Sequence, residues 1–195
     1  MEKKVIDKAD ALALIEREEG HFWDHKSAAS SGSTIQKIAS ALANSDGGEF
    51  IVGIEDRKKA NGIARWRGFA SVEDATPVLE ALARDVTPPV PYSIDFLAII
   101  GQDQAGITCH VFVRKSESVH YAADKRVYVR RGASTAAIEG RAITDLSLSK
   151  GARSYEDQLL SEFQLDDLIG EEELAYFLKS YSPSTAPSVG RYIGL

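Results

Sequence analysis

The segment spanning residues 44–56 constrains the fold of this chain more than any other part of the sequence. It opens with Asn-Ser-Asp-Gly-Gly, a combination that ends helices, and continues as a nearly continuous apolar run to Asp56. Just before it, apolar residues recur at helical spacing at Ile35, Ile38 and Leu42. An apolar run of this kind is typical of a central strand. The segment therefore predicts a helix that turns abruptly into a buried strand, with the two adjacent glycines permitting the tight turn.

The rest of the sequence alternates between helical and strand patterns. Helices are predicted from the capping aspartates near residue 7 to residue 19 and over residues 73–84, and strands over residues 21–26, 92–96, 107–113 and 126–132. Asn61-Gly62 predicts a turn, after which residues 63–66 would return as a partner strand. Together these patterns predict an α+β fold with a mixed, largely antiparallel sheet and flanking helices.

The chain has 195 residues, of which 44% are hydrophobic, enough for one well-packed domain with an appendage. After Lys150 the sequence becomes acidic and amphipathic, and then rich in Ser, Pro and Gly. We therefore expect one domain over residues 1–150, and over residues 151–195 a helical C-terminal extension that is the start of a further region.

Composition narrows the class of protein. The net charge of −6 opposes long-range attraction to phosphates unless the basic residues cluster. The sequence shows no signal-peptide pattern and no apolar run near the roughly 18 residues of a membrane span, so a cytoplasmic protein without membrane contact is expected. The single cysteine, Cys109, lies in an alternating apolar strand pattern and is predicted to be a buried structural thiol.

Three blocks of sequence, in order, carry a resemblance to a known family. The first block is Glu19 with Asp-His-Lys at residues 24–26. The second is Ala-Asn-Ser-Asp-Gly-Gly at residues 43–48 with Ile-Val-Gly-Ile-Glu-Asp at residues 51–56. The third is Tyr-Val-Arg-Arg-Gly at residues 128–132, with Ser134 and Thr135 following. Over roughly residues 10–148 this chain resembles the Schlafen AlbA-like domain family. It departs from the family pattern where Asp-His replaces Glu-Phe at residues 24–25, which shortens the carboxylate by one methylene.

The resemblance implies a catalytic metal site made of Glu19, Asp24 and Asp56. Carboxylates suit Mg²⁺ or Mn²⁺, which prefer oxygen ligands, and a bound ion can activate water and stabilise charge on a phosphate. From spacing alone another interpretation stays open: Glu19 is a solvated helix end, Asp24 is a surface strand residue, and Asp56 forms a turn.

Four further residues are candidates for nucleic-acid binding: Lys26, Tyr128, Arg130 and Arg131. Arginine pairs bidentately with phosphate, and an aromatic ring stacks on a base. Strand alternation sends the two arginines to opposite faces, so one of them is expected to face the ligand. Lys26 also fits a surface ion pair with Asp24, and the basic residues 58–59 either extend the basic surface or only solubilise a loop.

The resemblance favours a metal-dependent endonuclease acting on structured RNA such as tRNA, with RNA preferred to DNA and a homodimer as one arrangement. The alternatives are a non-catalytic DNA- or RNA-binding regulatory module of a transcription regulator and, less favoured, a nucleotide (ATP)-binding domain. The glycines of residues 44–48 lack the Lys-Ser/Thr ending of a phosphate-binding P-loop, which weakens the ATP-binding hypothesis.

Overall fold

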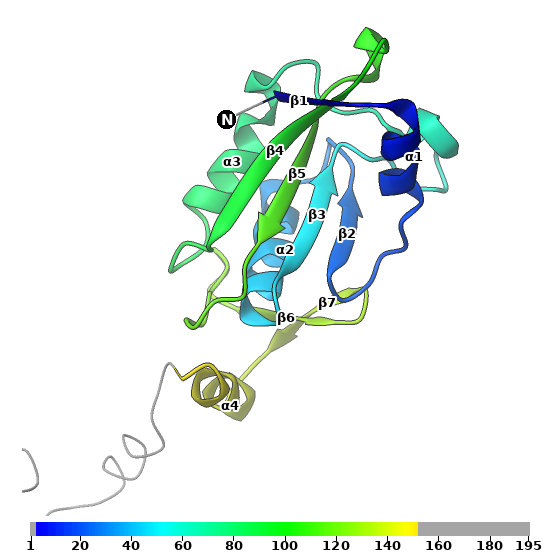
Figure 1. Ribbon diagram of the computed structural model, residues 1–195. Coiled ribbons are helices and arrows are strands. Elements are labelled where there is room, and N and C mark those ends of the chain that lie inside the picture. Colours follow the sequence, from blue (N-terminus) through cyan, green and yellow to red (C-terminus); the bar gives the residue numbers. More distant parts are fainter. Residues whose placement is uncertain (1–2, 152–195) are drawn as a thin grey trace, which may run out of the picture. The chain divides into compact units, whose positions relative to one another are not determined.

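A five-stranded mixed sheet frames the part of the chain that the computed structural model describes, residues 3–151 (Figure 1). In spatial order its strands are β1 (Lys3–Ile6), β4 (Tyr92–Ile99), β5 (Thr108–Val113), β3 (Gly48–Val52) and β2 (Trp23–Lys26). The two outer pairs, β1–β4 and β2–β3, are parallel, whereas β4–β5 and β3–β5 are antiparallel. The α+β class and the mixed sheet predicted from the sequence are confirmed.

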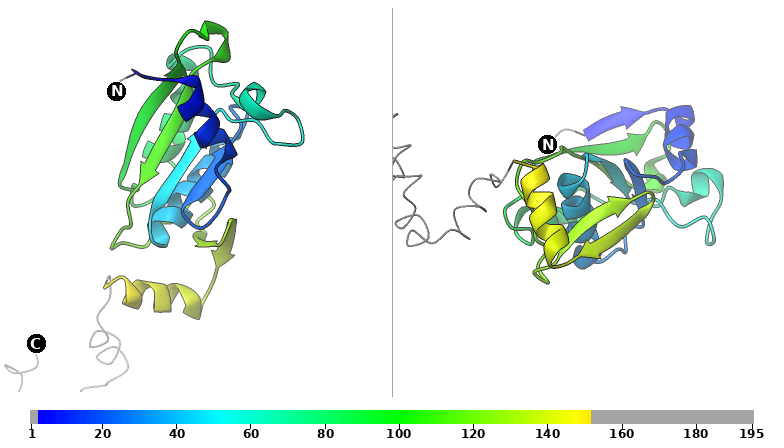
Figure 2. Two further views of the ribbon diagram at one scale, coloured as in Figure 1. Left: turned by 45° about the vertical axis from the view of Figure 1, so that its right-hand side comes forward. Right: turned by 90° about the horizontal axis from the view of Figure 1, so that it is seen from below.

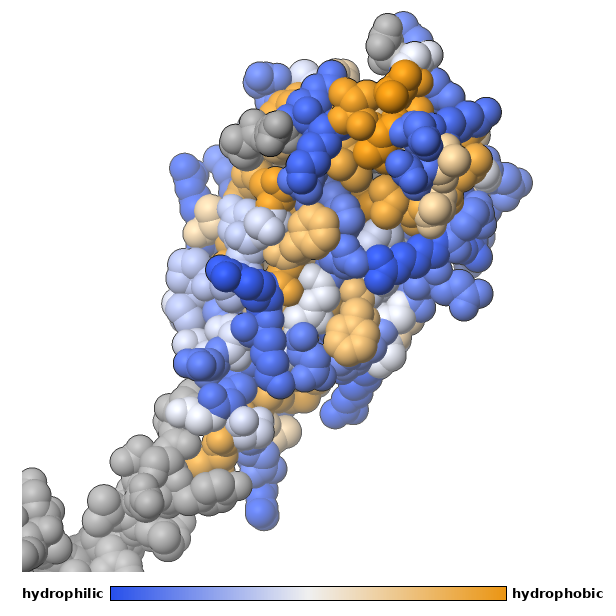
Figure 3. Space-filling view, in the orientation of Figure 1, coloured by the Kyte–Doolittle hydropathy of each residue, from blue (hydrophilic) through white to orange (hydrophobic). Residues whose placement is uncertain are grey.

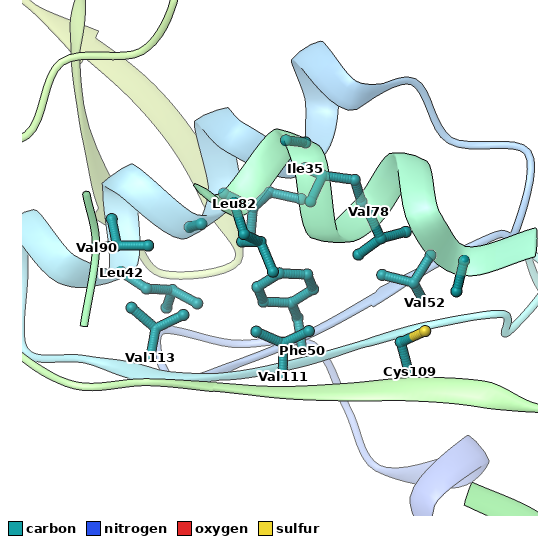
Figure 4. Packing of buried hydrophobic residues seen from close by; sticks show 14 of the residues in the cluster. Ile35, Leu42, Phe50, Val52, Val78, Leu82, Val90, Cys109, Val111 and Val113 are labelled. Atoms are coloured by element: carbon teal, nitrogen blue, oxygen red, sulfur yellow. The ribbon is translucent and has the colours of Figure 1, made fainter. Parts of the chain in front are cut away.

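One face of this sheet carries the larger core, beneath α2 (Gly32–Asn44) and α3 (Thr76–Ala83). Figure 4 shows Phe50 and Val111 from the sheet packed against Leu82 of α3, with Cys109 nearby. The opposite face carries a smaller core beneath α1 (Lys8–Glu16). Cys109 is fully buried, and burial raises the pKa of its thiol to about 12, as expected for a structural cysteine.

A separate hairpin packs on α2. It consists of β6 (Val127–Arg131) and β7 (Ser134–Ile138), and α4 (Arg141–Ser149) follows it (Figure 2). Because α2 lies between the hairpin and the large sheet, the helix is buried on almost every side, including the polar Gln36, Ser40 and Asn44. The helix thus connects the two sheets.

Asn44, at the end of α2, joins this helix to the β6–β7 hairpin. Its side-chain amide donates to the carbonyls of His120 (2.8 Å) and Tyr128 (2.9 Å), and its side-chain oxygen accepts from the His120 N–H at 2.8 Å. Gly47 and Gly48 then turn the chain into β3 at positive φ, 79° and 145°. The predicted tight turn is therefore present, and its asparagine holds a hairpin that lies far along the chain.

The structure differs from the predicted elements in several places, and β7 and α4 are among the elements that were not predicted. Residues 63–66 do not form a strand: a 3₁₀ helix, Gly62–Arg65, takes their place, and a single bridge joins Ile54 to Trp66. The first helix ends at Glu16 rather than at residue 19. β1 was not predicted, because its short Lys-rich sequence forms a strand only through parallel pairing with β4, about 90 residues away.

The remaining short helices are two 3₁₀ turns, Glu73–Ala75 before α3 and Asp103–Ala105 between β4 and β5. None of the helices in the described range is long and apolar enough to span a membrane. The predicted C-terminal extension, beyond its first residue, lies outside the described residues.

Candidate nucleic-acid interface

A cleft of about 700 Å³ lies where the end of α1 meets the loops that follow β2 and β3. Three segments supply most of its wall: residues 17–19, residues 25–27 with Ser30, and residues 54–59. Arg65, from the 3₁₀ helix, completes it. Of the seven residues singled out from the sequence, Glu19, Lys26 and Asp56 line this cleft. The other four, Asp24, Tyr128, Arg130 and Arg131, do not line it.

The cleft is more basic than the chain as a whole. Six cationic side chains line it against four carboxylates, a local charge of +2 in a chain of net charge −6. The cations are Arg17, Lys26, Arg57, Lys58, Lys59 and Arg65, and the carboxylates are Glu18, Glu19, Glu55 and Asp56. The basic residues therefore cluster locally, which the acidic composition had left open.

The six cations differ in their exposure and in the hydrogen bonds and ion pairs that they already make. Arg65 is buried and donates to the carbonyls of Ile15 at 2.7 Å and Glu55 at 2.8 Å, so it braces the wall, and burial lowers its pKa. Lys59 pairs with Glu55 at 3.3 Å, but 69% of its side chain stays exposed. Lys58 is also exposed. Lys58 and Lys59 are therefore the cations of the wall most available to a phosphate.

Asp24 lies in a buried ion pair with Arg130. The Arg130 Nη1 donates to Asp24 Oδ2 at 2.8 Å. Only 1% of the Arg130 side chain and 4% of the Asp24 side chain are exposed. The second Asp24 oxygen accepts a hydrogen bond from the Lys26 ammonium. Arg130 also donates to the Gly20 carbonyl at 2.6 Å and to the Thr135 hydroxyl at 3.1 Å. The sequence interpretations of Asp24 as a surface residue and of Arg130 as a ligand-facing arginine do not match these positions.

Glu19 and Asp56 lie on the cleft wall, each with a local partner. Glu19 Oε1 accepts from the His25 N–H at 3.3 Å and lies 3.7 Å from His25 Nδ1. His25 is buried, and burial lowers its pKa, so the ring is neutral near pH 7. Asp56 Oδ1 accepts from the Lys58 N–H at 2.7 Å, the geometry of a turn-forming aspartate.

The family resemblance implied that Glu19, Asp24 and Asp56 share a metal ion. Within residues 3–151, no three His, Cys, Asp or Glu side chains are grouped closely enough to hold a metal ion. The reason lies in the contacts of Asp24, since Arg130 and Lys26 engage both of its oxygens. In this conformation the three carboxylates do not fit a shared ion, although two of them line one cleft.

Tyr128 and Arg131 take opposite positions on the hairpin. Tyr128 is 7% exposed, packs with Ala41 and Ala122, and donates its hydroxyl to Asp124 at 2.6 Å. Its ring is therefore covered, so a base has no face of it on which to stack. Arg131 is exposed and Arg130 is buried, as strand alternation places them on opposite faces, and neither of them lines the cleft.

Sequence reasoning missed three of the six cations that line the cleft: Arg17, Arg57 and Arg65. Arg57 could have been found, because it adjoins the basic pair at residues 58–59. Arg17 and Arg65 carry no local signal. Arg65 reaches the end of α1 from 50 residues away, so only the folded chain brings it to the cleft.

Comparison with known proteins agrees with the resemblance. The family model described as "Schlafen, AlbA_2" matches residues 19–139. No curated protein matches this chain. A crystal structure of the DIP2311 protein from Corynebacterium diphtheriae is similar at a TM-score of 0.42 and 14% identity. That similarity covers 73% of this chain but only 31% of the other, so this chain spans about a third of that protein's length. The chain belongs to the Schlafen, AlbA_2 family, and its membership indicates a nucleic-acid-related domain.

Proposed function

We infer that this domain binds the sugar-phosphate backbone of a nucleic acid in the cleft beside α1. The observation that carries this inference is the local charge of +2 in the cleft of a chain whose net charge is −6. Phosphate affinity arises when Lys and Arg displace condensed counterions, and a concave, locally basic surface concentrates that effect.

Within the cleft, the exposed basic residues Arg57, Lys58 and Lys59 provide the phosphate contacts. Arg57 donates to the Glu16 carbonyl at 3.1 Å, which fixes it over the end of α1 while 54% of its side chain stays exposed. Lys26 lies deeper, held by Asp24 and by the His25 carbonyl at 2.8 Å. A nucleic-acid backbone in the cleft would thus contact the three exposed outer cations and, deeper in the cleft, Lys26.

Removing two outer cations tests the proposal. We expect Lys58→Ala/Lys59→Ala to weaken binding of RNA and DNA alike and to reduce the slope of log K against log salt by about 1.4 to 1.8, the value for two lost phosphate contacts. Fluorescence anisotropy over a salt series measures both quantities. The matched control is Arg84→Ala/Arg126→Ala, which removes two exposed cations that do not line the cleft. Equal effects of the two double variants would contradict the proposal.

The second candidate is the metal-dependent endonuclease of structured RNA that the family resemblance favours. Its support is that Glu19 and Asp56 line the same cleft as Lys26. Its weakness is the engagement of Asp24 by Arg130 and Lys26. The geometry therefore supports binding more strongly than hydrolysis.

Incubation of tRNA and of single- and double-stranded DNA with Mn²⁺ or with EDTA separates the two candidates. For a binding module we expect no cleavage and an affinity that EDTA does not change. Cleavage that needs Mn²⁺ and disappears in Glu19→Gln/Asp56→Asn would establish the enzyme instead. A preference for tRNA over DNA in the same assay would support the RNA preference that the resemblance favours.

A further inference from the structure

One edge of the five-stranded sheet is formed by β1, whose neighbour in the sheet is β4. The Ile100 N–H donates to the Ile6 carbonyl at 2.9 Å, so Ile6 directs its backbone groups toward β4. Backbone groups alternate in direction along a strand, so Lys3 and Val5 direct theirs away from β4. Among the residues that the structure describes, no strand pairs with that side of β1. The outer side of β1 is therefore an open edge.

This edge carries few of the features that usually prevent strand pairing. Proline, β-bulges and charged side chains are the common ones. β1 contains no proline, and its register with β4 is continuous. One of its two lysines, Lys4, pairs with Asp95 at 2.7 Å. Beside the edge, Val5 is 57% exposed and Ile100 is 64% exposed, and Figure 3 shows hydrophobic side chains gathered over this end of the molecule. Another strand can add to such an edge.

The order of side chains along β1 suits a second copy of the same strand. Lys3, Val5 and Asp7 lie on one side of the strand, since Asp7 is still extended at φ −79° and ψ 171°. In an antiparallel pair centred on Val5, each Lys3 lies opposite Asp7 of the other copy, and the two valines face each other. Lys3 and Asp7 are both exposed. A pair centred on Lys4 would oppose two lysines, so the charges favour the register centred on Val5.

We propose that β1 pairs antiparallel with β1 of a second copy of this chain, which joins two domains into one continuous sheet, five strands from each copy. The two Val5 residues exchange both of their backbone hydrogen bonds, because both direct these groups outward. Asp7 caps α1 through Oδ1, so Oδ2 accepts from Lys3 of the other copy. The twofold axis is perpendicular to the sheet, so both copies carry α1 on the same side. The interface is short, and the dimer is therefore weak and reversible.

Two cysteine substitutions test the register. Directly opposed residues of a hydrogen-bonded antiparallel pair have Cα atoms about 5.5 Å apart, which a disulfide spans. We expect Val5→Cys to form a disulfide between two copies in a glutathione redox buffer, seen by non-reducing electrophoresis. Lys3→Cys is the matched control, because this exposed position lies about 14 Å along the strand from its counterpart and should not crosslink. The native Cys109 is fully buried and does not interfere.

Val5→Pro tests the association itself. The Val5 N–H points away from β4, so proline removes an outward donor and leaves the β1–β4 ladder intact. We expect sedimentation velocity of the full chain to show a monomer that dimerises as its concentration rises. Val5→Pro should weaken dimerisation about 30-fold, the loss of two backbone hydrogen bonds. Val5→Thr, which keeps the N–H and the branched side chain, should associate like the parent chain.

Three results would each overturn the proposal. They are a parent chain that stays monomeric at high micromolar concentration, a dimer that Val5→Pro does not weaken, and equal crosslinking of Val5→Cys and Lys3→Cys. A monomeric parent would also be the result if another segment of the chain itself, rather than a second copy, covered β1. Urea unfolding of Val5→Pro confirms that its altered association comes from folded protein.

Discussion

Asp24 and Arg130 lie 106 residues apart in sequence and form a buried ion pair. Removing one member of such a pair leaves the other charge buried without compensation, which costs far more than losing a surface pair. Arg130 adds hydrogen bonds to Gly20 and Thr135, so it ties β6 and β7 to the chain just before β2. This arginine, expected to hold phosphate, instead has the contacts of a structural residue.

We therefore expect Arg130→Ala to lower the free energy of unfolding by about 3–5 kcal/mol. Arg131→Ala is the matched control, because the neighbouring arginine is exposed and should change stability by no more than about 0.5 kcal/mol. Urea denaturation followed by circular dichroism measures both. A loss under about 1 kcal/mol for Arg130→Ala would show that the pair contributes no more than a surface salt bridge.

At the scale of elements, the turn between α2 and β3 depends on close backbone approach. A Cβ placed on Gly48 would lie 2.8 Å from the Phe22 carbonyl oxygen and 2.9 Å from a Leu42 methyl group. The Phe22 oxygen accepts from the Glu49 N–H at 2.9 Å, so it is fixed in place next to β2. The glycine of the family block therefore allows β2 and β3 to begin side by side beneath α2.

Gly48→Ala should cost more than about 3 kcal/mol, because backbone strain at φ 145° adds to the overlap with Phe22. Gly62→Ala serves as the comparison. Gly62 has φ 51°, but a methyl group added there would meet nothing within 4 Å, so only the left-handed backbone penalty of about 1–2 kcal/mol applies. Thermal and urea unfolding of the two variants measure the difference, and equal losses would show that the close approach relaxes without cost.

At the scale of the whole molecule, three buried histidines couple stability to pH. Burial lowers the pKa of His25, His110 and His120 below the ordinary value of 6.5. Around and below pH 6.5 the unfolded chain therefore binds more protons than the folded protein, and protonation favours unfolding. The stability that the neutral rings provide is present above about pH 6.5 and is lost as the pH falls through their folded pKa values.

We expect the free energy of unfolding to fall between pH 7.5 and about pH 5.5, by up to about 1.4 kcal/mol per pH unit for each histidine. His120 Nδ1 lies 2.7 Å from the Pro88 carbonyl oxygen, and His120→Asn keeps a side-chain donor for that carbonyl. The substitution removes one titrating group, so the free energy of unfolding should fall less steeply with decreasing pH, by up to the contribution of one histidine. Urea titrations at several pH values measure the slope. A stability that stays constant or rises on acidification over this range would contradict the expectation.

The sequence by itself determined the class of fold, the helix–turn–strand unit at residues 44–56, the family, and the placement of Arg130 and Arg131 on opposite faces of their strand. These follow from local information, because apolar periodicity, turn glycines and strand alternation act between near neighbours. It also brought Glu19, Lys26 and Asp56 to notice, all of which line the cleft. Only the tertiary structure decided which partner each charged side chain meets. Asp24 pairs with Arg130, Tyr128 is covered by α2, and Arg65 reaches the cleft from a distant turn. Those outcomes depend on contacts between residues 50 to 106 positions apart, which local pattern does not encode.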